Sequence, residues 1–343
     1  MKKHSTLLLF TSLFSANALF SQPVFQKTYT GGSNITGSYA SPATSGIIVA
    51  ASTTSAPVDA ILMKTDLSGT LSWSKSYGGS GDDVFQAVKL TSDGGYIAAG
   101  YTTSSGAGGK DALLVKTDAS GNVTWSKTYG TVDDEQAFDV IQTTDGGYAF
   151  TGSAKIIPAN TSVGAISLIK TSSTGVVTWS NMWGAGGGNY GKTVMQTADG
   201  GYLVGGRASN GFFSLIKTTS LGVVSWARSN KPLTLQSVDC YQLIATSDGG
   251  YALLGSGDDS GNDLMIAFVK TDPNGIVTMS KTYNPGGAGV DLGFGIAQTS
   301  GGGYLILGYS SNFPPNFGNL YILTTSAAFA FVSAKTTTAI NYG

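Results

Sequence analysis

Apolar runs of strand length alternate along the chain with turns rich in Gly, Asp and Ser. In one representative stretch the runs are VFQAVKLT (84–91), GYIAAGYT (95–102), DALLVKT (111–117) and NVTWSKTY (122–129). The third run is almost continuously apolar, as expected of a strand that is covered on both faces. The Asp-Gly pair between the first two runs supplies the positive φ values of a tight hairpin turn. Because no long 3.6-residue period follows the N-terminal segment, the pattern predicts antiparallel strands throughout.

The same four-run unit recurs at intervals of about 50 residues, which indicates a repeat architecture. Each copy is marked by a DGGY-like block, whose last residue is Ile47, Tyr96, Tyr148, Tyr202, Tyr251 or Tyr304. Six units of four antiparallel strands predict an all-β fold, a six-bladed β-propeller that occupies 22–343 as a single domain. The segment VFQKTYTGG (24–32) matches a spare fourth strand, so the pattern also allows seven blades.

The length of each unit varies at one place only, the connection between its second and third strands. In contrast, the Lys of the third run and the Trp or Met of the fourth keep the same spacing, as in Lys116 and Trp125. Variable loops on a rigid scaffold are the usual place of recognition, so the side of the blades that carries them is the predicted binding face. These loops lie near 53–59, 103–110, 154–164, 208–212, 257–263 and 310–319.

Composition and charge narrow the classes of function. The first 21 residues join a basic start, Lys2 and Lys3, to a short apolar run and a small-residue segment, which is typical of a secretory signal peptide (1–21). The rest contains no candidate transmembrane segment. Loss of two of the 19 basic residues, against 20 acidic ones, leaves no basic patch for nucleic acid or an anionic membrane. The sequence therefore predicts an exported protein, secreted or at the cell surface.

Ser-His-Asp and Cys-His catalytic systems and the common zinc sites are excluded, because His4, the only histidine, falls within the predicted signal peptide and Cys240 is the only cysteine. We assign no catalytic residue and no cofactor. The carboxylates of the connections between units are the candidate ligand contacts, and with one acidic loop they are Asp82, Asp83, Asp133, Asp134, Glu135, Asp258, Asp259 and Asp291. Asp83, Glu135 and Asp291 occupy equivalent repeat positions, which makes them candidate Ca²⁺ ligands. Capping of loop backbone N–H groups is the other interpretation of these three.

The remaining repeated polar residues have a structural interpretation. Seven aspartates, including Asp93 and Asp118, occupy the two tight turns of the units, where Asp is a turn former. A lysine ends the third strand of five units, and we expect these side chains to be solvated beside the turn aspartates. They are Lys64, Lys116, Lys170, Lys217 and Lys270.

Asp118-x-x-Gly121 followed by Trp125 resembles the tryptophan-docking motif of quinoprotein-type propellers. In that family the Trp packs between neighbouring blades, which implies a docking role for Trp73, Trp125, Trp179 and Trp226. The whole unit, DGGYIAAGYTT…DALLVKTDASGNVTWSKTYG, is also similar to repeats of secreted bacterial surface propellers, many of which end in a type IX sorting domain. The resemblance brings no cofactor, because none of the quinoprotein cofactor motifs is present.

These observations favour a secreted or cell-surface binding and adhesion scaffold that is not an enzyme. Its expected partner is a surface protein or a glycan, and we expect a monomer. One alternative is a carbohydrate-active enzyme or lectin that uses carboxylates of the inter-blade loops, because glycosidases need two carboxyl groups across a sugar. The other alternative is a purely structural surface module of a larger secreted protein.

Overall fold

The computed structural model describes residues 35–156, 163–184, 186–232, 234–259, 261, 263–284, 289–311, 319–327 and 330–336. The predicted signal peptide (1–21) and the spare strand (24–32) lie outside these residues. The chain divides into two compact units, Met1–Gly187 and Gly188–Gly343. The described residues of each unit form three four-stranded antiparallel sheets and no helix.

The first unit contains β1 to β12, in which every strand pairs with the next one along the chain of its sheet. Its first sheet is formed by β1 (Ile35–Ala43), β2 (Gly46–Thr53), β3 (Ala60–Thr65) and β4 (Leu71–Tyr77). The second is formed by β5 (Asp83–Leu90), β6 (Tyr96–Thr102), β7 (Asp111–Thr117) and β8 (Val123–Tyr129). The third is formed by β9 (Gln136–Gln142), β10 (Tyr148–Ile156), β11 (Val163–Thr171) and β12 (Val177–Trp183).

The second unit repeats the same arrangement with β13 to β24. Its first sheet is formed by β13 (Tyr190–Gln196), β14 (Tyr202–Arg207), β15 (Phe213–Thr218) and β16 (Val224–Asn230). The second is formed by β17 (Ser237–Ala245), β18 (Tyr251–Asp258), β19 (Leu264–Thr271) and β20 (Val277–Tyr283). The third is formed by β21 (Asp291–Gln298), β22 (Tyr304–Ser310), β23 (Asn319–Thr325) and β24 (Phe331–Thr336).

The six sheets are the blades of an all-β, six-bladed β-propeller fold, which confirms the predicted fold class. Each sheet is a meander of consecutive strands, and its boundaries agree with the apolar runs of the sequence to within a few residues. That residues 22–343 form one domain stays a prediction.

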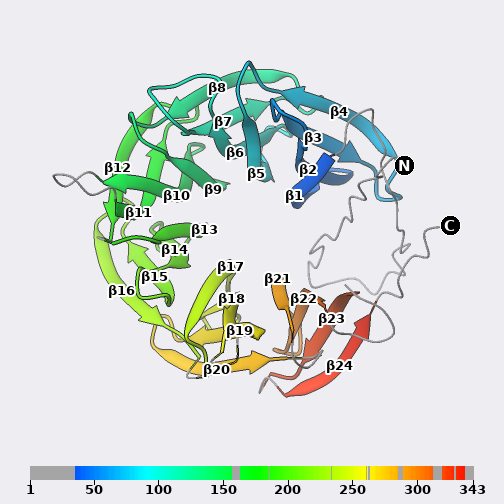
Figure 1. Cartoon of the computed structure of the whole chain (residues 1–343), viewed down its shortest axis with the longest axis vertical. Coiled ribbons are helices and arrows are strands. Elements are labelled where there is room, and N and C mark those ends of the chain that lie inside the picture. The colour runs from blue at the N-terminus through cyan, green and yellow to red at the C-terminus, as the bar shows by residue number, and fades with distance from the viewer. Residues whose placement is uncertain are drawn as a thin grey trace. The chain divides into compact units, whose positions relative to one another are not determined.

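Within each unit the blades pack side by side through their first and second strands. In the first unit β5 packs on β1 and β2, and β9 packs on β5 and β6. Figure 1 shows β1, β5 and β9 along one side of this unit and β4, β8 and β12 at the far edge of their sheets. The seam between the first two blades buries Leu62, Phe85 and Leu113. Because β3 and β7 are buried along their whole length, the prediction of third strands covered on both faces is confirmed for them.

The two glycines of the DGGY block are required for different physical reasons. Gly94 has φ +80° and nothing lies within 4 Å of an added Cβ, so this glycine is required by the backbone conformation. Gly95 is required by space, since its Cβ would lie 2.1 Å from the carbonyl oxygen of Thr117 and 2.7 Å from Lys116 Nζ. The second glycine thus lets the neighbouring third strand and its lysine approach the turn.

Candidate functional site

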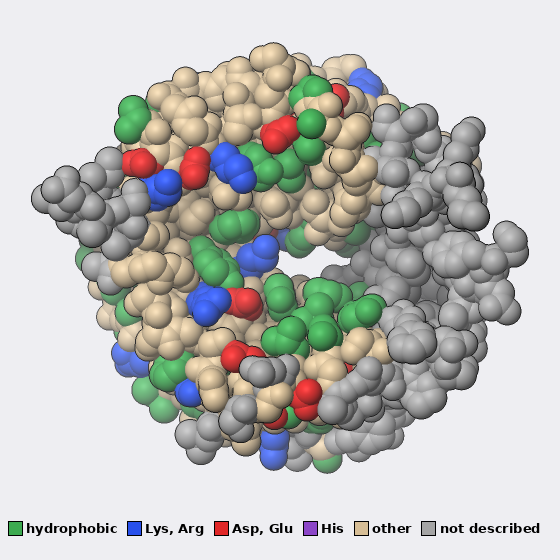
Figure 2. Space-filling view, viewed as in Figure 1, with side chains coloured by type: hydrophobic (Ala, Val, Ile, Leu, Met, Phe, Trp, Pro, Cys, Tyr) green, Lys and Arg blue, Asp and Glu red, His purple; other side chains and the backbone are tan. Residues whose placement is uncertain are grey.

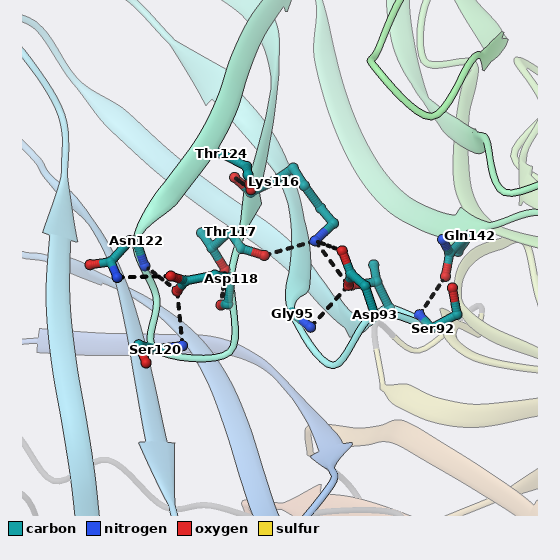
Figure 3. Close-up of polar contacts among 11 residues, drawn as sticks. Ser92, Asp93, Gly95, Lys116, Thr117, Asp118, Ser120, Asn122, Thr124 and Gln142 are labelled. Atoms are coloured by element: carbon teal, nitrogen blue, oxygen red, sulfur yellow. Dashed lines mark hydrogen bonds and ion pairs between the residues drawn. The ribbon is translucent and has the colours of Figure 1, made fainter.

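The lysine that ends the third strand is buried against the turn aspartate, so the prediction of solvated lysines is wrong for most of these residues. Lys116 is 5% exposed, and its Nζ donates to Asp93 Oδ2 at 2.8 Å and to the carbonyl oxygen of Thr117 at 2.8 Å. Figure 3 shows this network at the end of the hairpin turn. The same ion pair joins Lys170 to Asp145 at 2.9 Å, Lys217 to Asp199 at 2.7 Å, and Lys270 to Asp248.

Burial alone would raise the pKa of Asp93. Hydrogen bonds from Lys116, from the Thr91 hydroxyl and from the Gly95 amide outweigh it and hold the pKa at about 2. The pKa values of Asp145, Asp199 and Asp248 are lowered to about 2 by the corresponding lysine, hydroxyl and amide. These carboxylates are therefore ionised supports of the hairpin and are already engaged.

The first blade has the buried lysine without the aspartate. Lys64 is 7% exposed, and its Nζ donates to the carbonyl oxygens of Ser45 and Thr65, both at 2.9 Å. Burial lowers the pKa of Lys64, and the nearby charge of Asp66 only partly opposes this effect. In the first blade the lysine is therefore buried although its hairpin turn has no aspartate, and backbone carbonyl oxygens accept its hydrogen bonds.

The aspartates of the turn between the third and fourth strands also serve the backbone. Asp118 Oδ1 accepts hydrogen bonds from the amides of Ser120 (2.9 Å) and Asn122 (2.8 Å), and Figure 3 shows the closed turn. Asp272 accepts the equivalent bond from the amide of Asn274 at 2.9 Å. The turn side of the blades therefore carries carboxylates with structural partners.

On the opposite side, the carboxylates of the inter-blade connections hold the loops of the first unit. Asp82 Oδ1 accepts from the amide of Val58 at 2.9 Å. Asp83 is 3% exposed and accepts from the amide of Gly79 (2.9 Å) and the hydroxyl of Ser104 (2.5 Å). This connection is thus tied to the loops between the second and third strands of both blades that it joins.

The next junction repeats this arrangement. Glu135 is 7% exposed and accepts from the amide and hydroxyl of Thr131, at 2.7 and 3.0 Å. Asp134 Oδ1 accepts from the amide of Lys110 at 2.9 Å. The buried Asp111 carboxylate accepts from the amide of Ala107 at 3.1 and 3.2 Å. The loop near 103–110 is therefore fixed at both ends by side-chain oxygens.

Sequence reasoning missed two aspartates at the start of third strands in the first unit, Asp59 just before β3 and Asp111 as the first residue of β7. A Cβ on Gly130 would lie 2.2 Å from Asp111 Oδ1 and 2.8 Å from Glu135 Oε2, so these oxygens are at most about 5 Å apart. A Cβ on Gly78 would lie 2.3 Å from Asp59 Oδ1 and 3.1 Å from Asp83 Oδ2, which gives the same kind of pair. The sequence signal is an aspartate five residues before the strand-ending lysine.

The surface of the variable-loop side in the first unit carries charges of both signs. Lys155 Nζ lies 3.4 Å from Asp134 Oδ2 and 3.9 Å from Asp133 Oδ1. Lys110 Nζ lies 4.3 Å from the centre of the Tyr101 ring, in a cation–π contact. Figure 2 shows these two kinds of charged side chain close together on the part of the face formed by this unit. Val132, beside Gly108 of the loop, is 73% exposed.

In the second unit the remaining candidates are dispersed. The Ser237 hydroxyl donates to Asp258, and Asp259 Oδ1 accepts from the amides of Gly261 (2.7 Å) and Asp263 (3.1 Å). Asp291 begins β21 and is 1% exposed. Across the described part of the chain, no group of three or more His, Cys, Asp or Glu could hold a metal ion. Calcium binding at Asp83, Glu135 and Asp291 stays a prediction.

The predicted docking tryptophans lie on the fourth strands. The Trp125 ring meets the Tyr148 ring of the next blade edge-on, with centroids 5.7 Å apart, and approaches Gly175 of its last turn. Tyr129 in the same strand donates its hydroxyl to the carbonyl of Gly175 at 2.7 Å. Trp73 meets Tyr96 edge-on with ring centroids 6.0 Å apart, and Trp226 meets Tyr251 in a tilted arrangement at 6.4 Å. Trp179 lies half-buried on β12.

Comparison with known proteins finds distant similarity to solved structures but no match by sequence. No protein-family model matches the chain, and no curated protein does so at a significant level. Among solved structures, Sqt1 from Chaetomium thermophilum has a TM-score of 0.47 at 12% identity and covers 84% of this chain and 68% of that chain. An endo-1,4-β-xylanase from Bacteroides thetaiotaomicron has a TM-score of 0.37 at 14% identity and covers 74% and 93%.

A third similar structure is an extracellular domain from Bacteroides thetaiotaomicron, with a TM-score of 0.34 at 11% identity. It covers 88% of this chain and 53% of that chain. Such similarity carries no activity from these proteins to this one. Over the described residues, no helical stretch has the length and hydropathy needed to cross a membrane.

Proposed function

We propose that the protein is a secreted or cell-surface scaffold that binds a surface ligand, a protein or a glycan, through its variable-loop side and does not transform it. Export rests on the predicted signal peptide, residues 1–21. The single observation that carries the binding proposal is the use of buried carboxylates to fix loops. Asp83 and Glu135 accept hydrogen bonds from loop amides and hydroxyls, which supports preorganised loops on this side of the blades.

The charged surface beside these loops gives the ligand something to recognise. Lys155 and Asp134 are partly exposed at 35% and 48%, so their ion pair can exchange for contacts with a partner. The exposed Val132 side chain lies on the same connection and offers apolar contact. The exposed apolar side chain among charged groups matches the apolar centre and polar rim of an ordinary recognition surface.

The test is binding of the labelled full chain to intact bacterial and animal cells, measured by flow cytometry. Pretreating the cells with protease or with periodate separates a protein ligand from a glycan. Val132→Arg should weaken binding about tenfold or more, because it places a bulky charge in the centre of the contact. The matched control is Val176→Arg, since Val176 is 55% exposed in the turn before β12, at the other end of its sheet. Equal loss in both variants would contradict the proposal.

A further inference from the structure

The first strand of each blade carries a β-bulge at the same position. The residue left out of the pairing register is Ser38 in β1, Gln86 in β5, Lys192 in β13, Tyr241 in β17 and Phe294 in β21, while β9 shifts around Phe138. A bulge re-aims the side chain of the extra residue, and bulges are frequent next to binding sites. The six strands therefore present one re-aimed side chain each.

In the second unit these side chains form a chemically distinctive group. The Tyr241 and Phe294 rings meet edge-on, with centroids 5.8 Å apart and planes at 63°. Phe294 is 44% exposed although it lies on a first strand, where most apolar side chains of the unit are covered. The corresponding residues of β1 and β5 are the polar Ser38 and Gln86, so the aromatic pair is not a requirement of the bulge.

A hydrogen-bonded polar group is centred on Asp239, two residues before Tyr241 on β17, and includes Tyr190 of β13 and Arg207 of β14. Asp239 Oδ1 accepts from the Tyr190 hydroxyl at 2.7 Å and from Arg207 Nη1 at 2.9 Å. The Asp239 and Arg207 side chains are 41% and 33% exposed, so both are in contact with solvent. Both of these bonds use Oδ1, which leaves Oδ2 and other guanidinium N–H groups for a ligand.

The aromatic pair and the polar group are neighbours. Asp239 and Tyr241 flank Cys240 on β17, and β17 packs against both β13 and β21. Burial and then the charge of Asp239 raise the pKa of Tyr241, which agrees with their proximity. Figure 2 shows hydrophobic side chains gathered over β17 and β21, next to acidic and basic side chains over β13 and β14.

We propose that the bulged first strands of the second unit form a binding site for a neutral pyranose sugar. Its C–H face would stack on Phe294, and its hydroxyl groups would donate to Asp239 and accept from Arg207. A wholly apolar ligand would remove Asp239 and Arg207 from water without new partners, at an energetic cost. A sugar satisfies both requirements, because each of its hydroxyls is a donor and an acceptor beside an apolar ring face.

The experiment is saturation-transfer-difference NMR of the full chain with the methyl glycosides of glucose, galactose and mannose. Single-site binding is expected with a dissociation constant on the order of millimolar, typical of one small ligand with few contacts. Phe294→Ala should weaken it about tenfold or more, whereas Phe294→Trp should retain it. Arg207→Lys should also weaken it, because a point charge replaces a planar donor group.

The matched control is Phe138→Ala, which removes the same side chain from the bulge of β9. It should leave the signal of every glycoside unchanged, and thermal unfolding confirms that each variant folds. Absence of saturation transfer from all three glycosides, or equal transfer with Phe294→Ala, would overturn the proposal. The site does not depend on the variable-loop proposal, and Val132→Arg should leave glycoside binding intact.

Discussion

Replacing Asp93 by Asn tests whether the buried lysine needs the turn carboxylate. The amide can still accept from Thr91 Oγ1 and the Gly95 amide, so the change removes mainly the charge facing Lys116. A fall in pKa from 3.8 to about 2 corresponds to roughly 2.5 kcal/mol of preference for the ionised form. Since the Asp93 side chain is 62% exposed, solvent screening reduces the expected loss of stability to about 1 kcal/mol.

The assay is reversible urea unfolding of wild type, Asp93→Asn, Lys116→Met and the double variant at pH 7. We expect Asp93→Asn to lower the free energy of unfolding and the double variant to lose less than the sum of the single changes, because the pair is coupled. Asp118→Asn is the control, since the hydrogen bonds of the Asp118 carboxylate lie within its own exposed turn, and the midpoint should shift less. An unchanged midpoint for Asp93→Asn, or strictly additive losses, would refute the ion-pair account.

Three further predictions concern pH, the seams and the glycines. The folded-state pKa of Asp93 and its three counterparts lies below the unfolded value, so the stability that they contribute is present above about pH 4 and is lost as pH falls towards 2. Acid unfolding should therefore begin in that window, and Asp93→Asn should reduce the loss of stability there. Trp125→Ala should cost about 3 kcal/mol if it docks on the next blade, and a loss under about 1 kcal/mol in urea unfolding would contradict docking. Gly94→Ala should cost about 1 kcal/mol, because the added Cβ meets open space and only the positive φ opposes it. Gly95→Ala should destabilise the protein more, because its Cβ would clash with the Thr117 carbonyl oxygen. A lower melting temperature for Gly94→Ala than for Gly95→Ala would contradict the steric explanation.

Much of the fold could be predicted from sequence because its determinants are local. An apolar run such as 111–117 and an Asp-Gly turn each specify their own segment, and repetition of the unit specifies the meander. The turn role of Asp118 follows from neighbours within four residues. The side of the blades that carries the tight turns could therefore be distinguished by sequence from the side that carries the variable loops.

The features that sequence did not reveal depend on contacts between distant segments. Lys116 is buried beside Asp93 of another hairpin, whereas a strand-ending lysine taken alone is typical of a solvated position. The proximity of Asp111 to Glu135 depends on how two blades meet. Phe294 escapes the alternation of buried and exposed residues because the bulge interrupts the register.

The central claim is recognition through the variable-loop side, and the most direct test compares the cell-surface affinities of Val132→Arg and Val176→Arg, each relative to wild type. Both variants exchange an exposed valine of the first unit for arginine, so they differ mainly in the side of the blade that carries the change. The account predicts that Val132→Arg loses about tenfold or more and that Val176→Arg stays within about twofold of wild type. Loss confined to Val176→Arg, or no loss in either variant, would contradict recognition through the variable-loop side.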